Sequence, residues 1–367
     1  MRVVVLGGAG DMGSGAVEDL IQYTDAEVTI ADLNVPAAEK VAASLGSRVA
    51  VEKVDATSPA DLVRVIKGHA VAAGALGPFY RFEKPIVEAC LEAGVNYVSI
   101  CDDHDAAEAV LKLDPAAREK GLKMVTGLGW TPGITNMLAR KGYDELDRVD
   151  SIRVYWAGSA GDSTGFAVIL HTLHIFSGQV ASFQGGRMQE VKAGSEREVV
   201  EFLSPLGKVH TFHVGHPEPV TIPLYLEGVK EVTLKGGLAE NYLNNISLIL
   251  RSLRMNDKPW KKTALGKLFK ALLPLFPVNR ERSLSGARVD LIGYRGRQKV
   301  RLSYAVVDHM RRLTGIPLSI GAWMMARGEV KRTGVFGPEA PGGIDADIFL
   351  QEIARRKITV ERREEYL

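Results

Sequence analysis

The sequence predicts an α/β protein, with a doubly wound parallel sheet in its N-terminal third and an α+β domain after it. Between residues 1 and 126, short apolar segments alternate with segments of helical periodicity, at the spacing of β-α units. After about residue 145 the alternation gives way to strand-like segments broken by Gly and Pro. This second pattern is typical of a largely antiparallel sheet with added helices.

The first apolar segment, Val3–Leu6, runs into the glycine-rich turn Gly7–Gly13, and a segment of helical spacing follows. Gly8, Gly10 and Gly13 match the G-x-G-x-x-G pattern of dinucleotide-binding Rossmann folds. In that pattern the glycines permit the turn, the approach of a pyrophosphate and the close packing of helix on strand. The helix N-terminus adds N–H donors for the phosphates. The residues expected to bind the pyrophosphate are Gly8, Ala9, Gly10, Asp11, Met12 and Gly13.

Asp32 ends the second apolar segment, about 20 residues after Gly13. A carboxylate at this position accepts hydrogen bonds from the adenosine ribose hydroxyls, and it repels the 2′-phosphate of NADP. Leu33 and Asn34 follow, so no Arg stands there to hold such a phosphate. The sequence therefore favours NAD as the cofactor and leaves NADP open. Without this spacing, Asp32 would be read as an ordinary turn residue.

Four more strands are expected at 48–54, 70–75, 96–100 and 121–126, with helices at 36–45, 59–67 and 85–93 and a further helix through 113. Right-handed crossovers place the loops that follow parallel strands on one edge of the sheet. The residues expected beside the glycine turn on this edge are Asp55, Ala56, Gly74, Ala75 and Ser99. Asp55 could equally cap the helix that follows it.

The second part of the chain has a less regular pattern. Its expected strands are 149–156, 229–234, 287–294, 298–306 and three short pieces near Gln189, Thr211 and Thr221, and its expected helices are 162–173, 242–253 and 308–328. The last of these helices is expected to be interrupted by Gly315-Ile316-Pro317, because Gly and Pro disfavour helix interiors.

Composition restricts the function classes. The formal net charge of +2 over 367 residues gives no indication of nucleic-acid binding. The N-terminus lacks the features of a signal peptide, and the two cysteines, Cys90 and Cys101, are expected to be reduced thiols of a cytoplasmic protein. The segment 262–276 is amphipathic and could lie on a membrane, but its pattern favours a helix that faces the core or another subunit.

Four segments together resemble the saccharopine dehydrogenase-like superfamily. They are Gly8–Gly13 with Asp32; Gly77–Tyr80 with 85–98; Gly129–Asn136, similar to a G-x-x-P-G segment; and Thr314–Pro317 with Arg327-Gly328 and Gly334-Val335. The family includes saccharopine reductases and dehydrogenases, L-lysine 6-dehydrogenases and carboxynorspermidine dehydrogenases. The resemblance implies an NAD(P)-dependent oxidoreductase of amino-acid or lysine metabolism that moves a hydride at a C–N bond.

The resemblance also implies an organisation of the chain. It consists of an NAD(P)-binding Rossmann domain at 1–135, an α+β substrate and dimerisation domain at 136–307, and a C-terminal helical segment at 308–367 that returns to the first domain. A homodimer built on the second sheet is implied as well. The chain has Cys101-Asp102 where saccharopine reductases have Ser-Tyr, and Thr131 where they have Asp. The substrate therefore stays open between the saccharopine and lysine types.

Amine oxidation needs a base for the amine proton, which is commonly a His or a carboxylate. Asp102 and His104 follow the fifth strand on the ligand edge, and Thr131 could orient substrate or water, so these three are the catalytic candidates. Asp102 or Asp103 could instead cap the next helix. His171 and His174 lie three residues apart without an acidic neighbour, and we expect no metal site. The alternative function is a non-catalytic NAD-binding regulatory protein.

Overall fold

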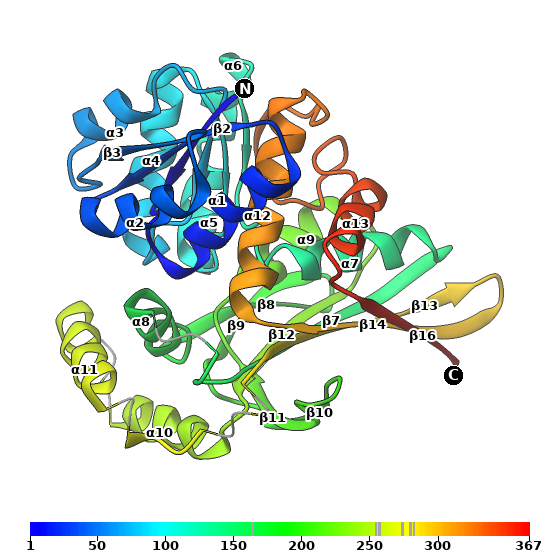
Figure 1. The fold of residues 1–367 in the computed structure, drawn as a ribbon. Coiled ribbons are helices and arrows are strands. Elements are labelled where there is room, and N and C mark those ends of the chain that lie inside the picture. Colours follow the sequence, from blue (N-terminus) through cyan, green and yellow to red (C-terminus); the bar gives the residue numbers. More distant parts are fainter. Residues whose placement is uncertain (163–164, 254, 256–257, 273–274, 279–280, 282) are drawn as a thin grey trace. The chain divides into compact units, whose positions relative to one another are not determined.

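The structure, a computed structural model, describes the chain except for residues 163–164, 254, 256–257, 273–274, 279–280 and 282 (Figure 1). The chain forms two compact units, each built from two separate stretches of sequence. The first unit comprises Met1–Ile134 and Arg311–Ile353, and the second comprises Thr135–Met310 and Ala354–Leu367.

The first unit contains a seven-stranded sheet in the order β15-β6-β5-β4-β1-β2-β3. Its strands are β1 (Arg2–Leu6), β2 (Glu27–Asp32), β3 (Val49–Lys53), β4 (Val71–Gly74), β5 (Asn96–Ser99), β6 (Lys123–Val125) and β15 (Gly334–Phe336). All neighbouring strands run parallel. The strand order reverses between β1 and β4, and ligands of such sheets bind at that point, beyond the carboxyl ends of the strands. The predicted doubly wound fold is therefore confirmed.

The helices of the first unit connect these strands. They are α1 (Asp11–Tyr23), α2 (Val35–Leu45), α3 (Pro59–Ile66), α4 (Phe79–Ala93), α5 (His104–Leu111), α6 (Asp114–Glu119), and, from the later stretch, α12 (Met310–Ala326) and α13 (Ala346–Arg355). Apolar residues of β1, β4, α3 and α4, among them Val4, Leu62, Ala72 and Ile86, form one buried core. Burial of such side chains stabilises the fold by roughly 1.5–3 kcal/mol each.

Helix α12 crosses α1 at very short range. A Cβ atom on Gly315 would lie 2.8 Å from the Ala16 nitrogen, and one on Gly15 would lie 3.0 Å from the Arg311 oxygen, so both positions exclude larger side chains. Nearby, the Ser319 hydroxyl donates to the buried Asp19 carboxylate at 2.6 Å. These contacts explain the T-G-x-P motif, which stands at a helix crossing.

Two expected helix limits are wrong. Helix α12 runs unbroken through Gly315-Ile316-Pro317, because its packing on α1 outweighs the low helix propensity of Gly and Pro. Helix α4 begins at Phe79 and contains Pro85 in its interior, although the sequence predicts a start at Pro85. Its buried side chains begin at Phe79, so the apolar face that holds the helix in place extends on both sides of the proline.

The second unit contains a nine-stranded sheet whose main path is β10-β11-β12-β7-β13-β14-β16, with β8 paired to β12 and β9. Its strands are β7 (Arg148–Gly158), β8 (Gln179–Gln184), β9 (Arg187–Lys192), β10 (Glu198–Glu201), β11 (Lys208–His213), β12 (Glu231–Leu238), β13 (Ser285–Arg295), β14 (Gln298–Asp308) and β16 (Val360–Tyr366). All pairings are antiparallel except that of β7 with β12. The predicted α+β class is confirmed.

Among the residues that the structure describes, five α-helices accompany this sheet: α7 (Ile134–Asp144), α8 (Phe166–Ile175), α9 (Glu218–Tyr225), α10 (Asn241–Ser252) and α11 (Pro259–Leu272). The strand expected near Thr221 is wrong, because this residue lies in α9. Within the expected helical segment 308–367 the structure forms α12, β15, α13 and β16. Residues 354–367 belong to the second unit, where β16 pairs with β14 through backbone hydrogen bonds. The highly charged sequence of β16 does not indicate a strand.

Helix α11 meets the expectation of a core-facing helix on one side only. Its Gly266 packs against Leu170 and Phe166 of α8, and Lys262 Nζ lies 2.6 Å from His174 Nδ1. Its opposite side exposes Trp260 and Leu268 to solvent. Within the described part of the chain, every helix is too short or too polar to span a lipid bilayer.

Candidate functional site

The turn between β1 and α1 is closed by its own backbone. Gly7 has φ +81°, which only glycine adopts without strain, and its oxygen accepts a hydrogen bond from the Gly10 nitrogen at 3.0 Å. A Cβ atom on Gly13 would overlap the Gly7 oxygen. The third glycine of the motif is therefore required for packing the helix against the turn, as the pattern predicts.

The same turn leaves the start of α1 open. Gly10 is exposed and stands at the N-cap without a side-chain capping bond, and Asp11 beside it is also exposed. A Cβ on Gly10 would have one close neighbour, the Gly7 oxygen at 3.2 Å. A pyrophosphate binds where the backbone can be approached closely, where N–H groups are available as donors, and where the positive end of a helix dipole favours negative charge. The residues present fit a dinucleotide.

Asp32 is fixed against the glycine turn. One carboxylate oxygen accepts from the Ala9 nitrogen at 3.2 Å, and the other accepts from the Asn34 nitrogen at 2.9 Å. This pair of bonds holds the carboxylate at the carboxyl end of β2, where an adenosine ribose is bound in this type of fold. Lys53 of β3 lies opposite Asp32 in the strand register, which places a cationic residue beside the carboxyl end of β2.

Asp55 does not cap α3, so that alternative is wrong. Ser58 is the cap and accepts from the Asp61 nitrogen at 3.3 Å. Asp55 instead accepts two hydrogen bonds from Thr57, from its nitrogen at 2.9 Å and its hydroxyl at 2.6 Å, and these lower the pKa of the Asp55 carboxyl. Ala56 lies within this turn, half-buried.

The end of β4 lies against the glycine turn. The Ala75 nitrogen donates to the Leu6 oxygen at 2.9 Å, and a Cβ on Gly7 would lie 2.8 Å from the Ala75 oxygen. Gly74 has a different task, because a Cβ there would overlap the Tyr97 hydroxyl. The sequence places Gly74 and Ala75 at the ligand edge, and the structure brings Ala75 directly beside Gly7.

A buried carboxylate that sequence reasoning missed lies behind this edge. Glu83 of α4 is fully buried and accepts hydrogen bonds from three hydroxyls. The donors are Tyr97 at 2.8 Å, Ser99 at 2.6 Å and Thr126 at 3.0 Å. Ser99, a predicted cofactor residue, therefore directs its hydroxyl to Glu83. A signal was present, since Glu83 interrupts an otherwise apolar helix face four residues after Phe79.

Burial raises the pKa of Glu83 to about 7, and the three hydroxyl donors limit that rise. A carboxyl group that titrates near neutral pH is common at functional sites, although structural networks also produce it. Cys101, which follows β5, is fully buried. Burial raises the pKa of its thiol, so this thiol is not a reactive one.

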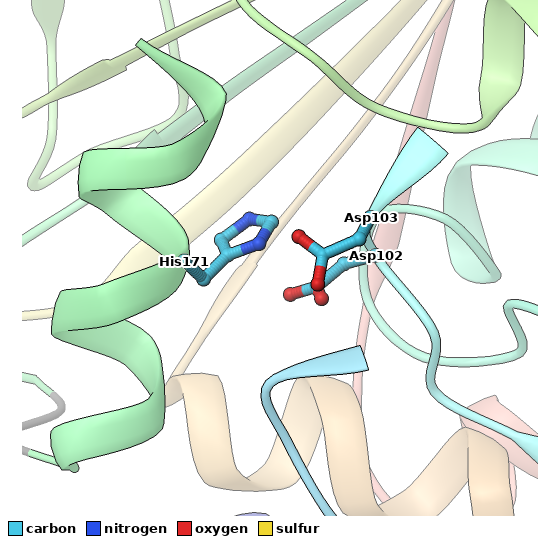
Figure 2. Close-up of side chains that lie close together, drawn as sticks. All are labelled: Asp102, Asp103 and His171. Carbon is cyan, nitrogen blue, oxygen red and sulfur yellow. The ribbon is translucent and has the colours of Figure 1, made fainter. Parts of the chain in front are cut away.

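The loop after β5 presents two neighbouring acids, drawn in Figure 2. A carboxylate oxygen of Asp102 lies within 4.8 Å of one of Asp103. Asp103 is 1% exposed and accepts from the Tyr80 nitrogen at 2.8 Å. It stands at the N-cap of α5 without a capping bond from its side chain, so its carboxylate serves the loop and not the helix. Asp102 and His104 are half-buried.

Thr131 lies in the loop Gly129–Gly133, which folds back on itself. The Gly129 nitrogen donates to the Pro132 oxygen at 2.8 Å, and the Ile134 nitrogen donates to the Gly129 oxygen at 2.9 Å. A Cβ on Gly133 would overlap the Gly129 backbone, so the G-x-x-P-G segment requires its last glycine. Thr131 is buried within this fixed loop, with 6% of its surface exposed.

In the second unit, the two histidines of α8 have different partners. His171, labelled in Figure 2, has its Nε2 atom 3.3 Å from Nε2 of His216, whereas His174 contacts Lys262. His216 Nδ1 lies 3.7 Å from the buried Glu218 carboxylate, which also accepts from the Thr135 hydroxyl at 2.9 Å. His171 thus contacts a second histidine, and that histidine lies beside Glu218 of α9.

The second unit also holds the basic residues considered for a substrate carboxylate. Lys235 is paired with Glu198 at 3.0 Å, and an Arg251 guanidinium nitrogen donates to the Ala193 oxygen. Arg153 and Arg187 are exposed. The geometry does not single out one of them as a carboxylate clamp.

Comparison with known proteins agrees with this geometry. Residues 3–125 match the family model of the saccharopine dehydrogenase NADP-binding domain. The chain is 30% identical over 96 residues to a saccharopine dehydrogenase-like oxidoreductase of Rattus norvegicus, and 31% identical over 88 residues to one of Mus musculus. These matches cover 26% and 24% of this chain but only 22% and 20% of the relatives.

The whole chain also has a counterpart among solved structures. Apo saccharopine dehydrogenase (L-Glu forming) from Saccharomyces cerevisiae superposes with a TM-score of 0.69, at 15% identity, over 99% of both chains. At that identity the likeness concerns the fold. Together with the glycine turn and Asp32, these findings identify the first unit as an NAD(P)-binding domain of an oxidoreductase family. Residues 3–125 are thus similar to the saccharopine dehydrogenase NADP-binding domain, and the chain has the fold of saccharopine dehydrogenase.

Proposed function

We propose that the chain is an NAD(P)-dependent oxidoreductase that transfers a hydride at a C–N bond of an amino acid or an opine-like secondary amine, of the saccharopine or lysine type. The observation that carries this proposal is the pair of acids after β5. One of them, Asp103, is buried and anchored to Tyr80, and the other, Asp102, is half-buried beside it. An amine substrate needs a proton acceptor, and a carboxylate held on a fixed loop supplies one.

The residues have distinct roles in this proposal. Asp102 accepts the proton from the substrate nitrogen, and Asp103 positions the loop by its bond to the Tyr80 nitrogen. The Thr131 hydroxyl orients the substrate or a water molecule, and His104 passes the proton onward. The glycine turn and Asp32 hold the dinucleotide, whose nicotinamide supplies the hydride acceptor when bound.

Asp32 favours NAD over NADP in this proposal, although the matched domain is named for NADP. Hydrogen bonds from the Ala9 and Asn34 nitrogens fix its carboxylate, and the negative charge of this carboxylate would repel the 2′-phosphate of NADP. Calorimetric titration of the protein with each cofactor measures the preference. We expect NAD to bind at least about tenfold more tightly than NADP. The substitution Asp32→Asn should reduce this ratio of the two affinities. Tighter binding of NADP would refute the assignment and would favour Lys53 as the phosphate partner.

The activity is tested with an amine panel that contains lysine, saccharopine, carboxynorspermidine and other opine-like compounds, with NAD or NADP. Formation of the reduced cofactor is followed by absorbance. Asp102→Asn is expected to lower kcat by roughly 10²–10⁴-fold with cofactor affinity unchanged. Glu108→Gln, an exposed carboxyl-to-amide change on α5, is the matched control.

Two results would count against the proposal. An unchanged rate in Asp102→Asn removes this residue as the base. Cofactor binding without turnover of any amine supports the alternative, a non-catalytic NAD-binding regulatory protein, which needs Asp32 and the glycine turn but no proton acceptor.

A further inference from the structure

Helix α11 carries an apolar stripe on the side that faces away from α8. Large apolar side chains recur along it at helical spacing, with exposed fractions of 66% for Trp260, 53% for Leu268 and 37% for Leu272. Leu275, just beyond the helix, is 76% exposed. Positions four residues apart share one helix face, so Trp260, Leu268 and Leu272 lie in one row. Contiguous exposed apolar surface of this kind marks an interaction site.

The opposite face of the helix is already used. Gly266 packs against Leu170 and Phe166, and Lys262 is buried beside His174. Figure 1 shows α11 next to α8 within the second unit. The orientation of the stripe is therefore fixed by this packing, and the stripe cannot turn inward without breaking the contact with α8.

Lysines border the stripe on both sides. At 100° per residue, Lys261 lies about 100° round the helix from Trp260 on one side of the row, and Lys267 lies about 100° from Leu268 on the other side; Lys270 lies further round. From residue 258 to residue 278 the sequence holds five lysines and no acidic residue. The exposed surface of α11 is thus a row of apolar side chains within a positively charged rim.

The apolar surface continues on α10. Ile249 is 56% exposed and Leu253 is 64% exposed. This helix is held beside the segment that follows α11, because the Tyr242 hydroxyl donates to the Pro277 oxygen at 3.0 Å and the Tyr242 ring lies 6.4 Å from that of Phe276. Two consecutive helices therefore contribute exposed apolar side chains to the same part of the second unit.

We propose that α11 docks this unit onto the surface of an anionic lipid bilayer. Trp and Leu insert into the boundary between headgroups and acyl chains, while the bordering lysines pair with anionic headgroups. A helix of 14 residues is about 21 Å long, too short to span the roughly 30 Å hydrocarbon core, so it lies in the interface plane.

Charge argues against a second copy of the chain as the occupant. A two-fold symmetric contact brings the same patch of both subunits together. It would place the lysines of one α11 against those of the other, with no acidic residue in the segment to offset them. Anionic lipid supplies the missing opposite charge.

Flotation with vesicles tests the proposal on the full chain. We expect the protein to float with phosphatidylcholine vesicles that contain about 30% phosphatidylserine and to stay unbound with pure phosphatidylcholine. Salt at about 0.5 M should release the bound protein. Lys261→Gln/Lys267→Gln should weaken binding about 30-fold, because each lysine near such a surface contributes about fivefold. Lys208→Gln/Lys299→Gln removes the same charge from exposed sites of the same unit and should leave binding unchanged.

The apolar row has its own test. Leu268→Gln should weaken vesicle binding about tenfold, whereas Leu224→Gln, at a site 59% exposed in α9, should not. Trp260 fluorescence should shift to shorter wavelength on vesicles, and Trp260→Phe should lose that shift. Trp130 and Trp156 are buried and Trp323 of α12 is half-buried, so loss of the shift in Trp260→Phe is what assigns the signal to α11.

Three outcomes would overturn the proposal. They are absence of flotation with anionic vesicles, equal loss of binding in the control and α11 variants, and a dimer in sedimentation that Leu268→Gln dissociates while no vesicle binding occurs. The last result would assign α11 to a second copy. None of them depends on turnover, so the test is independent of the proposed oxidoreductase activity.

Discussion

Replacement of Glu83 by glutamine should change how the stability of the first unit depends on pH. The side chain is fully buried and accepts from Tyr97, Ser99 and Thr126. Glutamine keeps the size of the side chain and one acceptor oxygen, and hydroxyl groups can rotate to accept from its amide. The substitution therefore removes a titrating group while it preserves most of the packing.

The magnitude follows from the pKa of Glu83, which burial raises from 4.5 to about 7. Between these values the folded protein retains a proton that the unfolded chain has released, so the free energy of unfolding falls as pH rises. This contribution is complete below pH 4.5 and is lost by about pH 7. The full difference is about 3 kcal/mol, since one pKa unit corresponds to about 1.4 kcal/mol. Between pH 5 and pH 8 it is about 2.5 kcal/mol.

Urea unfolding at a series of pH values measures this effect, with hydrogen exchange of the β5 amides to follow the first unit specifically. The wild-type protein should lose about 2.5 kcal/mol more stability from pH 5 to pH 8 than Glu83→Gln does. Glu88→Gln, at an exposed acid of the same helix, should behave as wild type. Parallel profiles for the wild type and Glu83→Gln would show that Glu83 does not titrate in this range, and the reasoning from burial would fail.

Three further substitutions test the packing described above. Gly13→Ala, whose Cβ would overlap the Gly7 oxygen, should lower the free energy of unfolding by about 1–3 kcal/mol and abolish calorimetric NAD(P) binding; retained binding would contradict a role in the turn. Ser319→Ala leaves the buried Asp19 without its hydroxyl donor and should cost about 1–3 kcal/mol in urea unfolding, and a cost near zero would contradict that bond. Deletion of 360–366 uncovers the edge of β14 and should cause concentration-dependent light scattering, whereas a monodisperse variant would show that this edge is protected otherwise.

The parts of the fold that the sequence predicts are those coded by local pattern. The glycine turn, Asp32 and the strands β1 to β6 each depend on residues close together in the chain, and the structure shows these strands in a parallel sheet, as predicted. The expected strand near Thr221 and the break at Gly315 failed for the opposite reason. In both places tertiary packing outweighs local propensity, as α12 shows where it crosses α1.

The site was predictable to a smaller extent. Asp102, Asp103 and His104 could be placed on the ligand edge because they follow a predicted strand. The hydroxyl partners of Glu83 lie 14, 16 and 43 residues away from it, so no local pattern announces their meeting. The stripe on α11 shows a related limit. An amphipathic pattern defines two faces of a helix, but it does not say which face the rest of the protein will cover.

The interleaved course of the chain has a consequence for folding. Each unit is completed by a stretch that follows most of the other unit in sequence: 311–353 for the first and 354–367 for the second. During synthesis, β14 emerges well before its neighbour β16, and its edge stays open while the intervening residues are made. Neither unit can be separated from the other by a single cut, and a cut between 311 and 353 leaves the fragments joined by packing and backbone pairing alone. Folding of the two units is thus tied to the same late stretch of chain.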